Sequence, residues 1–140
     1  MPATPITETS AFMDLSDRFQ RTTTVGASPA LAAETIIGTL NLANFGGITP
    51  VTGIELTGWA AFTVGTSGTA ATLRIRQTNV SGTVVVSTGA LTCAATNLLA
   101  PDVEGFDAAP GVAAYVLTLQ ITAGAAASTI SALMLKAKII

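Results

Sequence analysis

Short segments in which apolar and polar residues alternate recur along most of the chain, separated by small turn-forming residues. Alternation with a period of two, repeated at short intervals, is typical of an antiparallel all-β domain. After residue 25 no stretch keeps an apolar repeat with helical spacing. A chain with this pattern is therefore expected to fold as strands, with 140 residues enough for one domain and its own core.

The segments with strand character predict the main body of the domain. We expect strands at residues 35–42, 54–64, 72–79, 83–90, 114–122 and 129–140. Residues 96–111 are rich in turn formers and are expected to be a longer connection, with room for one or two short strands. Tight turns after the second and third strands predict hairpins, whereas the long late connection suits a Greek-key topology. The expected architecture is an antiparallel β-sandwich, jelly-roll-like or a related Greek-key barrel, with the strand order left open.

Alternation also predicts which side chains share a face. One face of each of three strands is expected to carry a mainly large apolar set. These residues are Ile54, Leu56, Ala60, Phe62 and Val64, then Leu73 and Ile75, and finally Leu133, Leu135, Ala137 and Ile139. Met134, Lys136 and Lys138 share the opposite face of the last strand. The single cysteine, Cys93, lies among small residues and is expected to be a buried filler.

The composition limits the partners of this domain. Hydrophobic residues make up 49% of the chain and charged residues only 10%, against about 25% in ordinary domains. Little charge means little self-repulsion, which favours association. A net charge of −2 gives no electrostatic case for nucleic acid binding. No apolar run approaches the roughly 18 residues of a membrane span, and residues 1–10 do not resemble a signal peptide.

Nothing in the sequence predicts an enzyme. The chain has no histidine and one cysteine, so a Cys–His nucleophile is impossible and a zinc site is not expected. Nucleophile-elbow, phosphate-loop and dinucleotide motifs are missing. Asp102, Glu104 and Asp107 are close enough in sequence for a calcium loop, but aspartate is also an ordinary turn former, and the turn interpretation is preferred. We expect no catalytic residue, no metal site and no cofactor.

The N-terminal segment differs from the rest of the chain. Phe12, Leu15 and Phe19 are spaced as one face of a short helix. About ten residues are too few for a helix that is stable alone in water, so this segment must dock on something. We divide the chain into an extended docking arm with a short helix, residues 1–28, and a β-sandwich domain, residues 29–140.

Charged pairs accompany this apolar face. Acid-before-base pairs at i, i+4 join Asp14 to Arg18 and Asp17 to Arg21, an order that supports a helix and keeps the arm soluble before docking. Arg18 and Arg21 join the three apolar residues as candidate partner-binding residues. The arm could dock on its own body or on a neighbour, and its flexible connection favours the neighbour.

Two sheet faces are candidates for oligomer or lattice contacts. Trp59 points away from the apolar face of its strand, where it is either an interface anchor or a filler covered by the arm or a loop. Arg74 and Arg76 point outward and either bind an acidic partner or are simply solvated. On the strand 114–122 the outward residues are half apolar and uncharged, which favours a contact between subunits. These outward residues include Val116, Thr118 and Gln120.

Residues 106–120, FDAAPGVAAYVLTLQ, carry a resemblance to a known family. An Asp, then Pro-Gly, then an alternating strand with Tyr and Leu-x-Leu resembles the penultimate strand of small jelly-roll decoration (cement) proteins and head-fibre or tail-fibre knobs of bacteriophages. The upstream Arg-Ile-Arg-Gln at 74–77 and the C-terminal strand agree. The resemblance implies a non-enzymatic homotrimer on the outer capsid surface of the virion, made in the host cytoplasm, whose arms bind the major capsid protein and clamp neighbouring capsomers.

Three other functions fit the sequence less well. A receptor-binding or carbohydrate-binding knob would use the same fold, but only 5% of the residues are aromatic, so this is the second choice. An ice-binding protein would need a regular threonine array, and the threonines show no fixed repeat. A small cupin-like enzyme would need metal-ligating histidines.

Overall fold

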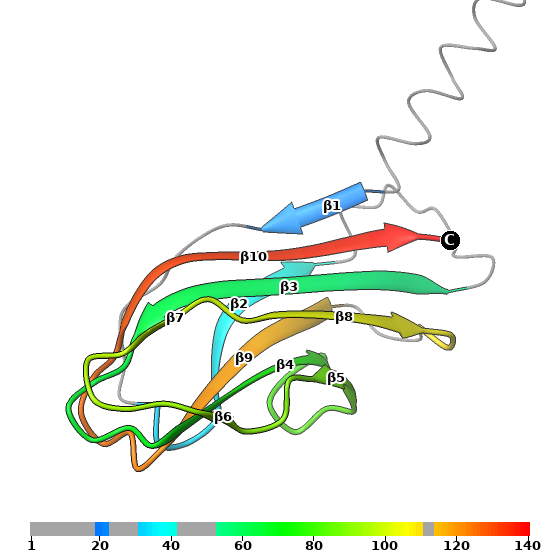
Figure 1. The fold of residues 1–140 in the computed structure, drawn as a ribbon. Helices are drawn as coiled ribbons and strands as arrows, with labels where there is room; N and C mark the ends of the chain where they lie inside the picture. Colours follow the sequence, from blue (N-terminus) through cyan, green and yellow to red (C-terminus); the bar gives the residue numbers. More distant parts are fainter. Residues whose placement is uncertain (1–18, 23–30, 42–52, 111–113) are drawn as a thin grey trace, which may run out of the picture.

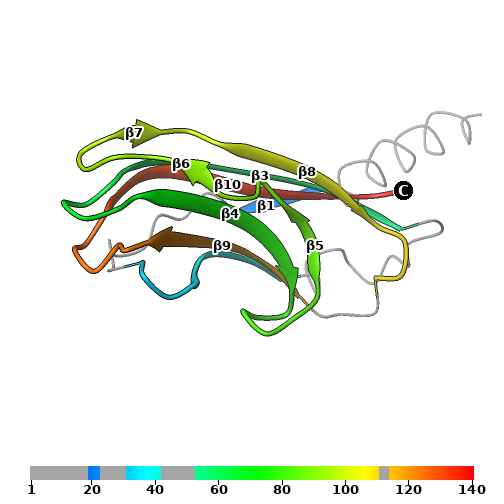
Figure 2. The same cartoon turned by 60° about the horizontal axis from the view of Figure 1, so that its bottom comes forward.

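The computed structural model describes residues 19–22, 31–41, 53–110 and 114–140. Two antiparallel sheets face each other as a sandwich, so the predicted fold class is confirmed (Figures 1 and 2). The first sheet contains β1 (Phe19–Thr22), β10 (Thr129–Ile139), β3 (Ile54–Thr63), β7 (Leu98–Leu99) and β8 (Asp102–Asp107). The second contains β2 (Thr35–Asn41), β9 (Ala114–Thr122), β4 (Ala70–Gln77), β5 (Val84–Ser87) and β6 (Leu91–Thr92).

The order of the strands is Greek-key in character and consistent with a jelly-roll-like fold. In the first sheet β3 lies between β10 and β8, and in the second β9 lies between β2 and β4. The hairpin predicted after β4 is confirmed, because β4 pairs with β5. The hairpin predicted after β3 is wrong, because β3 and β4 belong to different sheets. A tight turn thus carries the chain from one layer to the other instead of returning it to its neighbour.

The predicted strands match the observed ones closely where alternation is strong. Strand β9 has the expected bounds, and β2, β3, β4, β5 and β10 differ by a few residues at their ends. The turn interpretation of Asp102 and Glu104 is wrong, because both lie within β8 on either side of the buried Val103. Strand β8 adds to the edge of β3, a tertiary pairing that local turn propensity does not reveal.

The core lies between the two sheets and uses the predicted apolar faces. All of the residues assigned to those faces are at most 4% exposed, and β9 adds Tyr115, Leu117, Leu119 and Ile121, each 0% exposed. Gly58 marks a close approach of the layers: a Cβ there would lie 2.7 Å from Cδ1 of Leu117 and 3.2 Å from Cδ1 of Ile75. The side chains of the opposite sheet occupy the space that glycine leaves free.

The end of the predicted arm helix is a strand. Residues 19–22 form β1 and pair antiparallel with β10, with Phe19 opposite Lys138 and Thr22 opposite Leu135. The helical prediction is therefore wrong for Phe19 and Arg21. The backbone groups along the edge of a strand can pair with another segment, and this pairing outweighs a weak local helical preference. Phe12, Leu15 and Arg18 lie outside the described residues.

Candidate functional site

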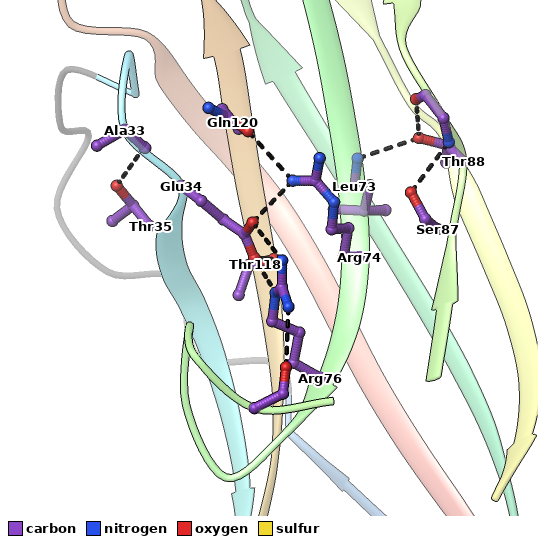
Figure 3. Close-up of polar contacts among 12 residues, drawn as sticks. Ala33, Glu34, Thr35, Leu73, Arg74, Arg76, Ser87, Thr88, Thr118 and Gln120 are labelled. Carbon is purple, nitrogen blue, oxygen red and sulfur yellow. Dashed lines mark hydrogen bonds and ion pairs between the residues drawn. The ribbon is translucent and has the colours of Figure 1, made fainter. Parts of the chain in front are cut away.

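The outer face of the second sheet carries a cluster of polar side chains around Glu34 (Figure 3). Glu34 lies just before β2, and its carboxylate meets two guanidinium groups of β4. Nη1 of Arg74 donates to Oε1 at 2.8 Å, Nη2 of Arg76 donates to Oε1 at 2.9 Å, and Nε of Arg76 donates to Oε2. The pair with Arg76 is bidentate, the strong geometry for arginine and a carboxylate.

Strand β9 and the β4–β5 turn complete this cluster. Oγ1 of Thr118 donates to Oε2 of Glu34 at 2.7 Å, and Oε1 of Gln120 accepts from Nη1 of Arg74 at 3.2 Å. Nη1 of Arg76 also donates to the carbonyl oxygen of Gly82 at 2.8 Å. The cluster, defined as Glu34, Arg74, Arg76, Thr118 and Gln120, thus connects the segment before β2 to β9 and β4.

The cluster fixes the charge state of its carboxylate. Burial raises the pKa of Glu34, but hydrogen bonds from Arg76 and Thr118 and the positive charges of both arginines outweigh burial, so this pKa lies below its ordinary value. The hydrogen bond to Glu34 in turn raises the pKa of Arg76. Two guanidinium groups share one carboxylate, so the cluster keeps one excess positive charge at neutral pH.

The predicted interface residues of this sheet are brought together, but not as an open surface. Thr118 is 0% exposed and Val116, which is opposite Arg76 in the register, is 1% exposed. The arginine side chains are 21% and 18% exposed. Their partner Glu34 was missed as a functional residue, because only the pairing of β2, β9 and β4 brings it next to them. No local sequence pattern signals a contact across 42 residues.

The outer face of the first sheet contains Trp59. The indole is half-buried, and its neighbours in the register are Met134 of β10 and Asp102 of β8. Trp59 therefore points away from the core, as predicted. Among the described strands, none lies over this face of the sheet (Figures 1 and 2).

A buried polar group ties the two sheets together at one end. Asp107 ends β8 and accepts hydrogen bonds from Oη of Tyr115 on β9 and from Nε2 of Gln77 on β4, both at 2.6 Å. Its other oxygen accepts from the backbone nitrogen of Ala109 at 3.0 Å. Burial raises the pKa of Asp107, but these hydrogen bonds outweigh it and the pKa lies below its ordinary value. Asp107 thus connects β8 of the first sheet to β9 and β4 of the second.

The described residues do not form a metal site. No group of three or more potential ligands among them could hold an ion. Asp102 and Glu104 are exposed on the outer side of β8, whereas Asp107 is turned inward, so the three carboxylates do not converge. Cys93 is a buried free thiol, as predicted, and burial raises its pKa. No helix of the described segments is long and apolar enough to cross a membrane.

No protein-family model matches the chain, and no curated protein is similar to it in sequence. Similarity is found among solved structures. The VP2 protein of infectious bursal disease virus in T=1 particles is similar over 88% of this chain, with 12% identity and a TM-score of 0.53. VP2 in the subviral particle of the same virus is similar over 88% of this chain, with 13% identity and a TM-score of 0.52.

The match covers only part of VP2. The chain spans about a third of the length of these viral proteins, 32% and 34%. A pilus protein of Bacillus endospore appendages is also similar, over 87% of this chain and 88% of that one, with 20% identity and a TM-score of 0.47. At these identities the VP2 likeness defines the fold: a β-sandwich of the kind found in a protein that forms virus particles.

Proposed function

We propose that this protein is a non-enzymatic structural subunit of a virus particle, in particular a decoration or cement protein on the outer capsid surface. The observation that carries the proposal is the fold that the chain shares with particle-forming VP2 over 88% of its length. The charge-poor composition, 10% charged residues, supports association over a solitary state. The bacteriophage family remains an inference from the resemblance at residues 106–120.

The mechanism is non-covalent clamping. The protein binds the major capsid protein and copies of itself, with a homotrimer as the form that the resemblance implies. Many copies on one shell add weak contacts together, so each copy needs only a modest contact area. The cluster around Glu34 holds the strands of the second sheet together, and the Asp107 hydrogen bonds join the two layers. Such a sandwich provides a rigid body for the clamp. No cofactor, nucleic acid or membrane takes part, and the protein acts on the virion after synthesis in the host cytoplasm.

The arm supplies the contact with the shell. Phe12 and Leu15 provide the apolar anchor, and Arg18 provides charge beside it. Phe19 and Arg21 belong to β1, where the arm leaves the sandwich. β1 lies beside β10, so the segment that precedes it starts from an edge of the sandwich. An arm that starts at this edge can reach a neighbouring subunit while the body stays folded.

A receptor-binding or carbohydrate-binding knob is the second candidate. It is favoured by two aromatic side chains on one outer face, the half-buried Trp59 and the 46% exposed Phe106. Binding of glycans to this face without binding to shells would support the knob over the cement protein.

Shell binding by the full chain tests the proposal. Capsid shells are mixed with the protein and sedimented, and the bound fraction is measured for three proteins. We expect the wild type and the control Ile6→Ser to bind, and the double variant Phe12→Ser, Leu15→Ser to lose at least about tenfold in affinity. Equal binding by all three would contradict the role of the arm, and no binding by any would contradict the proposed function.

A further inference from the structure

On the outer face of the first sheet, basic and acidic side chains lie on different strands. β3 lies in the middle, β10 on one side and β8 on the other. The basic side chains Lys136 and Lys138 lie along β10, and the acidic side chains Asp102 and Glu104 lie along β8. We call this surface the Trp59 face. Its two flanking strands therefore carry opposite charge.

The register puts these charges at matching heights. Thr57 of β3 has Lys136 opposite it on one side and Glu104 opposite it on the other. One step along β3, on the same face, Trp59 has Met134 and Asp102 as its neighbours. Lys136 and Glu104 therefore lie at the same height along β3, on opposite sides of that strand.

Apolar side chains and the carboxylate of Glu55 occupy much of the remainder of this face. Glu55 is exposed on β3, between Lys138 of β10 and Phe106 of β8. Trp59, Met134, Ala61 and Ala132 are all partly exposed, next to one another on β3 and β10. At the far end Phe106 is 46% exposed and Ile140 is 39% exposed. Partly exposed aromatic and Met side chains flanked by charge are the composition of a protein–protein interface.

We infer that the Trp59 face binds the same face of a second copy of the chain, about a two-fold axis that runs along β3. Rotation about this axis keeps the height of each residue and exchanges the two sides of the sheet. The acidic strand β8 of one copy then faces the basic strand β10 of the other, so that Glu104 meets Lys136 twice in each pair of copies. A two-fold contact uses the same patch on both partners, which is what a self-complementary charge pattern requires.

Other axes do not give this match. A two-fold axis in the plane of the face but perpendicular to β3 would put β8 on β8 and β10 on β10, which opposes like charges. With the axis along β3, Trp59 and Thr57 lie close to the axis and face their own copies, at the centre where anchor residues carry most of the binding energy. Glu55 also faces its own copy, and Lys138, opposite it in the register, provides a positive charge on the same face. Lys136 also has an interaction within its own chain, so the inference uses the position of its charge and not a vacant amine.

This inference rests on the self-association part of the proposed function and names the copy that occupies one surface. It does not depend on binding to a shell. It applies whether the unit that pairs is one chain or a trimer, because the pairing joins two copies in either case.

Charge reversal tests the pairing. The mass of the full chain is measured by sedimentation over a range of concentrations, and we expect it to double as concentration rises. Glu104→Lys and Lys136→Glu are each expected to raise the dissociation constant of the pair about tenfold or more. The double variant is expected to have a dissociation constant within about threefold of the wild-type value. The control Thr92→Lys, on the exposed part of the other sheet, should leave it unchanged.

A cross-linking measurement keeps the test valid if a reversal harms folding. Thr57→Cys is treated with a short reagent that joins two thiols, and a covalent pair is expected because this position faces its own copy. Thr92→Cys is the control and should give none. Wild-type behaviour by both single reversals, or no doubling at any concentration, would overturn the inference. If the full chain does not bind shells but its mass still doubles with concentration, the proposed function is contradicted and the inference stands.

Discussion

Arg76 donates hydrogen bonds to both carboxylate oxygens of Glu34 across strand β9, although 42 residues separate Arg76 from Glu34 in the sequence. Replacing Glu34 by Gln removes the negative charge and leaves two guanidinium groups without their counter-ion. Because hydrogen bonds to charged groups are worth about 1.5–3 kcal/mol, we expect Glu34→Gln to lower the free energy of unfolding by about 2 kcal/mol. Urea unfolding at neutral pH measures this loss.

The matched control is Glu55→Gln, which changes an exposed carboxylate on the other sheet. Its effect is expected to stay within about 0.5 kcal/mol, as for other surface substitutions. Equal losses in both variants would contradict the view that the cluster around Glu34 stabilises the second sheet.

Acid is expected to destabilise the protein through Glu34 and Asp107. Both have pKa values in the folded state below their ordinary values of 4.5 and 3.8. The unfolded chain therefore binds protons more readily than the folded one, so the stabilising contribution is complete above about pH 5 and is lost as the pH falls through the lowered values. The midpoint of urea unfolding, measured from about pH 7 down to about pH 2, should fall steadily over this range. In Glu34→Gln the unfolding midpoint should fall less steeply with pH. A pH dependence equal to that of the wild type would exclude Glu34 as a source of the acid destabilisation.

Tyr115 should stay protonated as long as the protein is folded. Burial, together with the hydrogen bond to Asp107 and its negative charge, raises the pKa of this phenol far above its ordinary value. Tyr115 is the only tyrosine in the chain, so its ultraviolet absorbance reports one group. In an alkaline titration, phenolate absorbance is expected to appear together with loss of the folded circular dichroism signal. Phenolate formation in the folded protein near pH 10 would contradict the buried position.

Removing the Tyr115 hydroxyl tests the tie between the sheets. Tyr115→Phe removes one of the three hydrogen-bond donors to Asp107 and leaves Gln77 and the backbone nitrogen of Ala109. We expect a loss of about 1–2 kcal/mol in the free energy of unfolding, because a buried acceptor loses a partner. Thermal unfolding at neutral pH measures it, and a variant as stable as the wild type would show that the bond adds nothing.

Gly58 is expected to resist enlargement. A Cβ there would lie 2.7 Å from Cδ1 of Leu117, so Gly58→Ala must push side chains of the opposite sheet aside. Overpacking of this kind costs about 1–3 kcal/mol. The control Thr92→Ala, at an exposed position of β6, should change the free energy of unfolding by no more than about 0.5 kcal/mol. Equal stability of Gly58→Ala and the wild type would contradict the close approach of the layers.

Alternation predicted the β-sandwich and the apolar faces of β3, β4 and β10, because burial on one side of a strand imposes a period of two on its sequence. The pairing of distant strands is not encoded locally. It was this pairing that placed Glu34 beside Arg74 and Arg76, added Asp102 and Glu104 to the edge of β3, and made a strand of Phe19 and its neighbours. Trp59 could be placed on the outer side from alternation alone, but its acidic and basic neighbours depend on the order of the strands.

The mass of the full chain in solution tests the central claim, that this protein is an assembly subunit, most directly. Light scattering at neutral pH over a wide range of concentrations is expected to give a defined oligomer, with a mass that is a whole multiple of 14.0 kDa. A single-chain mass at every concentration would contradict the account.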